Sequence, residues 1–246
     1  MLSIIIPTLN EEKYLPLLLE EVKKQDFKDY EIIVADAGSK DKTVKIAEDF
    51  GCRVVKGGLP AKGRNEGAKT AKGDLFLFTD ADNLFLPENF LKNLIEEFEK
   101  RKLGIASFPI YPKGNRLDKI FYGLYNFWAK ISQKFLPHAT NSILVKREIH
   151  QKINGFNEEV KLAEDHDYAR RAGKYGQFGF IQTEPVLTSS RRLEAEGRLK
   201  TYFIYVLAGI YMLLFGSIKT DIFKYRFYNY RLIAEIRRLK SLKIRK

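Results

Sequence analysis

The amino-acid sequence predicts an α/β fold, with a parallel sheet that has helices on both faces. Three observations lead to this prediction: short apolar runs alternate with amphipathic stretches along the first 110 residues, the turns between them are short, and residues 75–78 are all apolar. Continuous apolar runs are typical of parallel strands, because helices cover them on both faces. The chain has 246 residues, 45% of them hydrophobic, which is ample for a core.

Five strands and four helices are expected in this first part of the chain. The strands are residues 3–6, 31–35, 53–56, 75–79 and 105–109, and the helices between them are residues 13–24, 41–50, 62–72 and 87–102. The polar clusters PTLNEE, DAGSKD and DADN follow the first, second and fourth strands. Each cluster alone is consistent with ordinary turns and helix caps. Because all three fall at the carboxyl ends of strands, where such sheets bind ligands, together they indicate a site.

Two carboxylates, Asp80 and Asp82, follow the fourth predicted strand with Ala81 between them. Side chains alternate along an extended chain, so both carboxylates would point the same way. Like charges this close repel unless a cation lies beside them. A hard divalent ion suits an all-oxygen site, so we expect Mg²⁺ or Mn²⁺ here, with open positions for a diphosphate.

Residues 115–137 crowd aromatic side chains among lysines, which predicts an amphipathic helix inserted over the site. This helix could also face a membrane or an acceptor, or pack in the core. Further on, the stretch AEDHDYARRA predicts the start of a helix, since acidic residues in a first turn complement the helix dipole. The three histidines, at 138, 150 and 166, have no metal-ligand spacing.

The C-terminal residues carry most of the net charge of +12. Residues 219–246 contain ten Lys or Arg and two acidic residues, so their net charge is +8. A basic tail suits nucleic acid or an anionic membrane. The mostly apolar residues 202–218 precede this tail. They favour a membrane surface over nucleic acid as the partner of the tail, so no nucleic-acid partner is expected.

Residues 202–218 allow three arrangements: a helix lying in the membrane interface, a single span, or a buried core helix. Residues 231–246 have the spacing of an amphipathic helix. We expect residues 199–246 to form a membrane-associating helical tail on the cytoplasmic side of the cell membrane, peripheral or monotopic. Residues 1–6 do not resemble an export signal, and the single cysteine, Cys52, excludes an intramolecular disulfide and fits a reducing compartment.

Four motifs, IIIPTLNEE, DAGSKDKT, GRNEGAKTAKGDLFLFTDADN and AEDHDYARR, resemble those of the family 2 glycosyltransferases in order and spacing. The resemblance covers residues 2 to about 190 and implies the GT-A fold, a mixed Rossmann-like sheet flanked by helices. It implies a catalytic domain at residues 1–198, with a donor half at 1–110 and an acceptor half at 111–198. The implied donor is a UDP- or GDP-linked sugar.

The resemblance also implies roles for single residues. The implied metal ligands are Asp80 and Asp82, which with Ala81 match the diphosphate-binding motif. The other donor-binding residues would be Pro7, Thr8, Asn10 and Glu11 on the nucleoside side, Asp36 at the base or ribose, and Gly63, Arg64 and Asn65 at the diphosphate. Arg191 would contact a donor or acceptor phosphate, or extend to the membrane interface.

Glu164 and Asp165 match the family's ED motif, which implies that Asp165 is the general base for an acceptor hydroxyl, with Asp167 as the alternative. One base is enough, because the metal and Arg64 can neutralise the leaving diphosphate. A single displacement inverts the anomeric centre. The acceptor would be a hydroxyl or a lipid-linked group, and polyprenyl- or dolichyl-phosphate glycosyl synthesis is the alternative reaction.

The sequence departs from the family pattern in two places, and each departure bears on the expected reaction. Ala37 replaces the second acidic residue of the frequent D-D-G-S form, which bears on recognition of the donor base. Near Arg191, SSRR stands where processive synthases have Q-x-x-R-W, and this second departure disfavours long-chain synthesis. A nucleotidyltransferase is less consistent, because PTLNEE is not a Gly-rich loop. A non-catalytic, membrane-tethered binding module is the third possibility.

Overall fold

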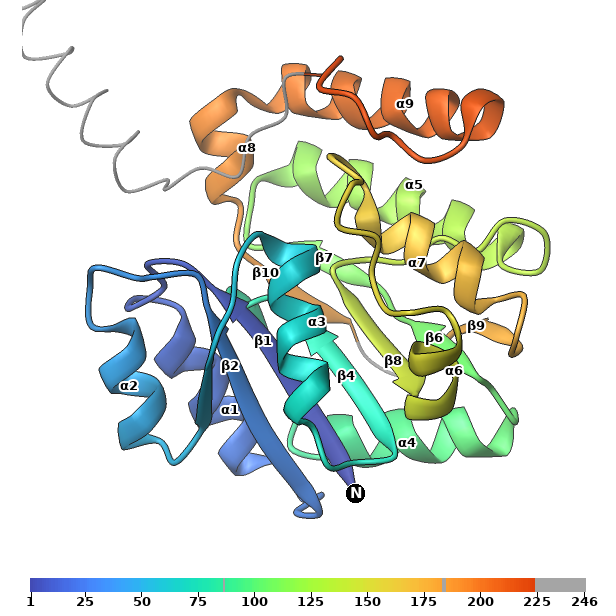
Figure 1. The fold of residues 1–246 in the computed structure, drawn as a ribbon. Helices are drawn as coiled ribbons and strands as arrows, with labels where there is room; N and C mark the ends of the chain where they lie inside the picture. Colours follow the sequence, from blue (N-terminus) through green and yellow to red (C-terminus); the bar gives the residue numbers. More distant parts are fainter. Residues whose placement is uncertain (86, 183–184, 224–246) are drawn as a thin grey trace, which may run out of the picture.

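A seven-stranded sheet forms the centre of the computed structural model, which describes residues 1–85, 87–182 and 185–223 (Figure 1). The strand order is β3-β2-β1-β4-β8-β6-β9. These strands are β1 (Leu2–Thr8), β2 (Tyr30–Asp36), β3 (Arg53–Lys56), β4 (Leu75–Thr79), β6 (Ile105–Ser107), β8 (Ser142–Lys146) and β9 (Phe178–Phe180). A smaller sheet, in the order β5-β10-β7, contains β5 (Asn83–Leu84), β7 (Ile110–Pro112) and β10 (Val186–Thr188).

The predicted parallel strands are confirmed. β1 pairs in parallel with β2 and β4, and β2 pairs in parallel with β3. Their central residues, such as Ile4, Ile33 and Leu77, are fully buried. β-Branched side chains pack well on a pleated surface, which explains the isoleucine-rich β1 and β2.

The large sheet is mixed and not parallel throughout, which corrects the prediction from the alternating pattern. β8 runs antiparallel between β4 and β6, with Phe78 opposite Ile143 and Ile105 opposite Val145. This strand is absent from the predicted set, because the apolar run SILVK does not by itself reveal a direction or a neighbour. The mixed sheet implied by the GT-A resemblance is confirmed.

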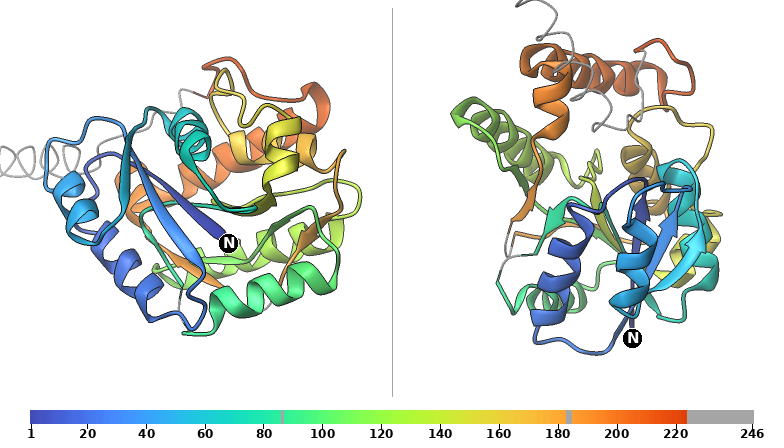
Figure 2. Two further views of the ribbon diagram at one scale, coloured as in Figure 1. Left: turned by 60° about the horizontal axis from the view of Figure 1, so that its bottom comes forward. Right: turned by 90° about the vertical axis from the view of Figure 1, so that its left-hand side faces the viewer.

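Helices cover both faces of the sheet (Figure 2). One face carries α1 (Leu15–Lys24), α2 (Thr43–Asp49) and α4 (Phe90–Lys100), and the other carries α3 (Pro60–Thr70), α6 (Arg147–Lys152) and α7 (Glu164–Ala172). The four helices predicted in the first 110 residues are confirmed, with ends that differ by at most three residues. Buried leucines and phenylalanines at helical spacing hold α1 and α4 against the sheet.

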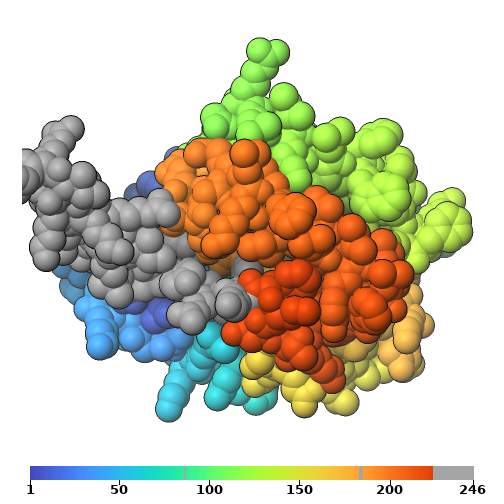
Figure 3. All heavy atoms as spheres, turned by 90° about the horizontal axis from the view of Figure 1, so that it is seen from above, coloured from blue at the N-terminus to red at the C-terminus, as the bar shows by residue number. Residues whose placement is uncertain are grey.

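Three helices form a layer above the edge where β1, β2 and β4 end. They are α5 (Arg116–Ser132), α8 (Arg191–Glu196) and α9 (Arg198–Phe215), and from above α5 lies beside α9 (Figure 3). α9 begins and ends a few residues before the predicted apolar segment. Among the described residues, α9 is the single helix whose length and composition would suffice to cross a membrane.

Neither α5 nor α9 is a core helix. Phe127 on α5 is 62% exposed and Phe203 on α9 is 63% exposed, so the alternative of burial in the core is wrong for both segments. The amphipathic helix predicted at residues 231–246 lies outside the described residues.

Candidate active site

Asp80 and Asp82 lie on a turn that buried polar side chains fix in place. Asn83, the residue after the pair, is fully buried, and its Nδ2 donates to Thr79 Oγ1 and Ser142 Oγ, each 3.0 Å away. Asn141 Nδ2 in turn donates to Asn83 Oδ1 at 3.0 Å. These asparagines were not singled out from the sequence, because Asn83 lies almost sixty residues from both Ser142 and Asn141. The turn is therefore held before any ligand binds.

Arg64 on α3 lies at the centre of the site. Its side chain is 2% exposed, and its Nη2 donates to Asp80 Oδ1 at 2.9 Å. Its Nη1 donates to Glu164 Oε1 at 2.9 Å and lies 3.3 Å from Asp165 Oδ1. Burial lowers the pKa of Arg64, but Asp165, Asp80 and Glu164 raise it above its ordinary value, so the guanidinium stays charged. One cation thus joins the predicted donor-binding and acceptor-binding halves.

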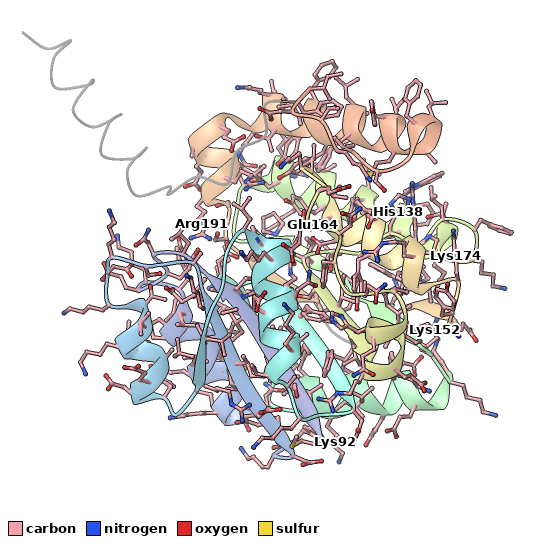
Figure 4. All side chains as sticks on the ribbon, viewed as in Figure 1. Lys92, His138, Lys152, Glu164, Lys174 and Arg191 are labelled. Carbon is pink, nitrogen blue, oxygen red and sulfur yellow. The ribbon has the colours of Figure 1, made fainter. Side chains whose placement is uncertain are left out.

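Arg191 forms a second ionic cluster beside the first. Its Nη1 and Nη2 each donate to a carboxylate oxygen of Glu11 at 2.7 Å, and its Nε lies 3.3 Å from Asp82 Oδ2. Ser189 Oγ also donates to Asp82. The guanidinium lies over the ring of Tyr14, 4.9 Å from its centroid. Arg191 therefore faces the site, and the alternative that it extends to the membrane interface is wrong (Figure 4).

The cations beside Asp80 and Asp82 in the structure are guanidinium groups, a different one for each carboxylate. The sequence indicated a divalent ion as the neutralising charge and did not indicate these two pairs. Among the described residues no group of three or more His, Cys, Asp or Glu is arranged to hold a metal. The carboxylates still fit Mg²⁺ or Mn²⁺, because such ions take oxygen ligands and complete their shells with water and phosphate. Metal binding here stays a prediction.

Burial raises the pKa of three carboxyl groups in the site. For Asp165 burial is the largest cause and outweighs Arg64, so its pKa lies well above the ordinary value. Burial likewise raises the pKa of Asp80 despite Arg64, and that of Glu11 despite Arg191. Asp165 Oδ1 is buried and accepts no hydrogen bond within the described chain. A carboxylate with a raised pKa and a spare acceptor is suited to take a proton.

The start of α7 fixes where the ED pair points. Ala163, just before the helix, has a left-handed backbone with φ 61°, which costs a non-glycine residue roughly 1 kcal/mol or more. Glu164 and Asp165 then lie in the first turn, where the helix dipole favours carboxylates. Asp167 faces elsewhere, because it pairs with Arg171 at 2.7 Å and accepts from Ser217. The alternative that Asp167 is the base is therefore not supported by its position.

Asp36 and its neighbours join two loops at the same sheet edge. Asp36 Oδ1 accepts from the backbone N–H groups of Gly38 and Ser39, at 2.9 and 2.7 Å, and its Oδ2 accepts from Thr8 Oγ1 at 2.9 Å. Asn10 Oδ1 accepts from the backbone of Lys40 at 2.9 Å. These bonds hold the PTLNEE and DAGSKD loops together, as a preformed base or ribose site would require.

The remaining predicted donor-binding residues lie outside the two arginine clusters. Ala81 is buried in the turn, and Gly63 allows α3 to approach Pro7, whose Cβ would lie 3.1 Å from a Cβ at Gly63. Asn65 does not join the Arg64 cluster. Its Nδ2 donates to Phe156 O at 2.9 Å and its Oδ1 accepts from Phe156 N at 2.8 Å. Asn65 therefore holds the turn at residues 153–159 against α3.

Comparisons with known proteins point to one family. Residues 3–153 match the model of the family described as glycosyl transferase family 2. An uncharacterised glycosyltransferase from Haemophilus influenzae is 31% identical over 186 residues, which are 68% of this chain and 60% of that protein. The chain thus spans less than two thirds of that relative's length. A Methanococcus voltae protein, a dolichyl N-acetyl-α-D-glucosaminyl phosphate 3-β-D-2,3-diacetamido-2,3-dideoxy-β-D-glucuronosyltransferase by name, is 37% identical over 112 residues, 41% of this chain and 35% of its own.

A solved structure shares the fold. It is a mannosyltransferase from Pyrobaculum calidifontis in complex with GDP-mannose and Mn²⁺, with a TM-score of 0.66 and 19% identity over 87% of this chain and 70% of its own. At this identity the likeness shows the GT-A fold alone. The match to the family model covers more than half of the residues, and the chain therefore belongs to glycosyl transferase family 2.

Proposed function

We propose that this glycosyltransferase is an inverting enzyme that moves a hexose from a UDP- or GDP-linked donor to a hydroxyl of a lipid-linked or saccharide acceptor. The observation that carries the proposal is the position of Arg64, whose guanidinium contacts Asp80 at 2.9 Å and Asp165 at 3.3 Å. A diphosphate bound at Asp80 and an acceptor bound at Asp165 would therefore meet on either side of one cation.

Each part of the site has a role in this reaction. Asp165 takes the proton of the acceptor hydroxyl as its oxygen attacks the anomeric carbon. The bond from that carbon to the diphosphate oxygen breaks, and Arg64 stabilises the negative charge that develops on the leaving group. When bound at Asp80 and Asp82, Mg²⁺ or Mn²⁺ would neutralise further charge on the diphosphate. The sugar carbon is attacked from the side opposite the leaving group, so its configuration inverts.

The names of similar proteins support the substrate classes without fixing them. The Pyrobaculum structure holds GDP-mannose and Mn²⁺, and the name of the Methanococcus relative describes transfer to a lipid-linked sugar. The apolar helix α9 and the basic C-terminal residues support a location at the cytoplasmic face of the cell membrane.

The proposal is tested by incubating the purified full chain with UDP- and GDP-sugars, Mn²⁺ and a lipid-linked acceptor. We expect release of nucleoside diphosphate that depends on the donor and rises when the acceptor is added. Exchange of pyrophosphate would instead indicate a nucleotidyltransferase. An absence of hydrolysis and transfer with every donor would indicate a binding module and overturn the proposal.

A further inference from the structure

α5 buries two polar side chains and exposes six large apolar ones, unlike an ordinary surface helix. Its buried residues are Asp118, Asn126 and Ala129. Asn126 Nδ2 donates to Ile110 O at 2.9 Å, so its amide is paired inside the protein. The outward side chains are apolar and each at least 45% exposed: Leu117, Ile120, Leu124, Phe127, Trp128 and Ile131.

α9 presents a second apolar face and is attached to the protein along its other side. Its inner face packs Ala208 and Met212 against Leu162 and Ile218. Arg170 Nη1 also donates to Met212 O at 2.9 Å. The outward side chains are Leu199, Phe203, Val206, Leu207, Ile210, Leu213, Leu214 and Phe215. A helix held in this way lies along the protein surface and does not project from it.

The two apolar faces belong to one surface. The rings of Phe121 on α5 and Tyr202 on α9 stack with centroids 4.0 Å apart. Arg198 Nε donates to Asp118 Oδ1 at 3.0 Å, which ties the starts of the two helices together. From above, α5 and α9 lie side by side on the same side of the molecule (Figure 3). We call their outward side chains, as given above for each helix, the α5–α9 face.

The exposed charges on α5 and α9 themselves have one sign. Arg116, Lys119 and Lys130 on α5 and Lys200 on α9 are exposed. The two helices contain a single acidic residue, Asp118, and it is fully buried. Apolar and aromatic side chains bordered by Lys and Arg match the boundary between acyl chains and anionic headgroups. A second copy of the chain would bring the same positive charges against these, so it is the less suitable occupant.

We propose that the α5–α9 face docks on an anionic phospholipid bilayer, with both helix axes in the plane of the membrane. This goes beyond the expected membrane tail, because α5 supplies part of the surface and residues 224–246 are not required for it. α8 and α9 lie above the carboxyl edge of β1, β2 and β4, so docking turns the site towards the bilayer (Figure 1). An acceptor held at headgroup depth would then reach Asp165 without leaving the membrane.

The test is flotation of the purified full chain with lipid vesicles. Vesicles of phosphatidylcholine and phosphatidylglycerol at roughly 7:3 supply the anionic surface, and pure phosphatidylcholine is the neutral comparison. The α5 variant carries Leu124→Glu and Phe127→Glu, and the α9 variant carries Leu207→Glu and Leu214→Glu. We expect each variant to partition at least about tenfold less than the parent into anionic vesicles, since two apolar anchors are lost and two negative charges are added.

A control places one glutamate outside the α5–α9 face. Tyr175 lies outside both helices and is 51% exposed, and Tyr175→Glu should bind vesicles like the parent. Every variant keeps the basic residues 224–246, so differences report the α5–α9 face alone. Normal binding of the α5 variant would overturn the proposal, as would a parent that stays unbound. A concentration-dependent dimer that only the α5 variant abolishes would identify a second copy as the occupant. Donor-induced thermal shifts in solution test folding and the proposed reaction separately from vesicle binding.

Discussion

At the residue scale, the site is a set of five carboxylates that share two arginines. Arg64 contacts Asp80, Glu164 and Asp165, and Arg191 contacts Glu11 and Asp82. A donor diphosphate would therefore enter a site in which both guanidinium groups already have carboxylate partners. Removing one partner is costly in such a network, because the remaining charge is left buried.

Replacing Asp165 with Asn should lower the transfer rate by at least roughly a hundredfold, because the acceptor proton then has no base. Donor affinity should change little, since Asp165 lies on the acceptor side of Arg64. Turnover measured at saturating donor, together with donor titration calorimetry, checks both statements. The control is Asp167→Asn, which removes the carboxylate that pairs with Arg171 outside the site and should keep substantial turnover. A normal rate for Asp165→Asn would refute the assignment.

The pH dependence of the rate follows from the raised pKa of Asp165. The base must be deprotonated, so activity should fall as the pH drops through this raised pKa. The acidic limb of the rate profile should accordingly lie well above the ordinary pKa of an aspartate, which is about 3.9. Stopped-time assays in a series of buffers measure the limb. A rate that stays constant down to pH values near the ordinary aspartate pKa would be inconsistent with this base.

Arg64→Met should destabilise the fold by about 3 kcal/mol or more, because three carboxylates then share a buried site without their cation. The control is Lys45→Met, since the Lys45–Asp49 pair is 72% and 59% exposed and should contribute less than about 1 kcal/mol. Urea unfolding followed by circular dichroism compares the two variants. Equal midpoints for Arg64→Met and Lys45→Met would show that the network does not stabilise the protein.

At the element scale, short segments were predictable and their neighbours were not. Apolar runs predicted β1 and β4, and helical spacing predicted α1 and α4, because these signals are local. The antiparallel β8 was not predictable in this way, since its place between β4 and β6 depends on residues far along the chain. The contact between Arg64 and Asp165 was not predictable either. The motif resemblance named both residues, but they are about a hundred positions apart in the sequence, and no local pattern shows that they touch.

Two glycines in different elements give opposite predictions for substitution by alanine. Gly155 has φ +69°, and a Cβ there would lie 2.5 Å from Asn65 Oδ1. Gly155→Ala should therefore cost about 1 kcal/mol or more and shift the turn that Asn65 holds. Gly123 lies within α5 and a Cβ there meets nothing within 4 Å, so Gly123→Ala should stabilise by about 0.5 to 1 kcal/mol. Thermal melting of both variants measures these changes in stability. A Gly155→Ala protein as stable as the parent would contradict the prediction that the turn requires glycine.

At the scale of the whole molecule, the predicted donor and acceptor halves would meet across the ionic network. Residues 1–110 supply Glu11, Arg64, Asp80 and Asp82, and later residues supply Glu164, Asp165 and Arg191. Their division into two halves of one catalytic domain stays a prediction. How tightly these two parts are joined was not predictable from the sequence, because ion pairs between distant residues leave no local pattern.

Donor binding should stabilise the whole molecule. UDP or GDP with Mn²⁺ should raise the melting temperature, and a hundredfold excess over the dissociation constant corresponds to about 2.7 kcal/mol. Chelation of the metal should remove most of this effect. Asp82→Asn, which weakens the predicted metal site and its pairing with Arg191, should also reduce the shift. A shift that is unchanged after chelation would argue against a metal at Asp80 and Asp82.

The short α8 connects two regions that otherwise have separate tasks. Arg191 opens this six-residue helix, and Gly197, with φ +94°, joins it to α9. A tilt of α9 relative to the sheet would move α8, and with it the Arg191 guanidinium that pairs with Glu11 and Asp82. The proposed contact of α9 with lipid and the predicted donor site would thus be separated by fewer than two turns of helix.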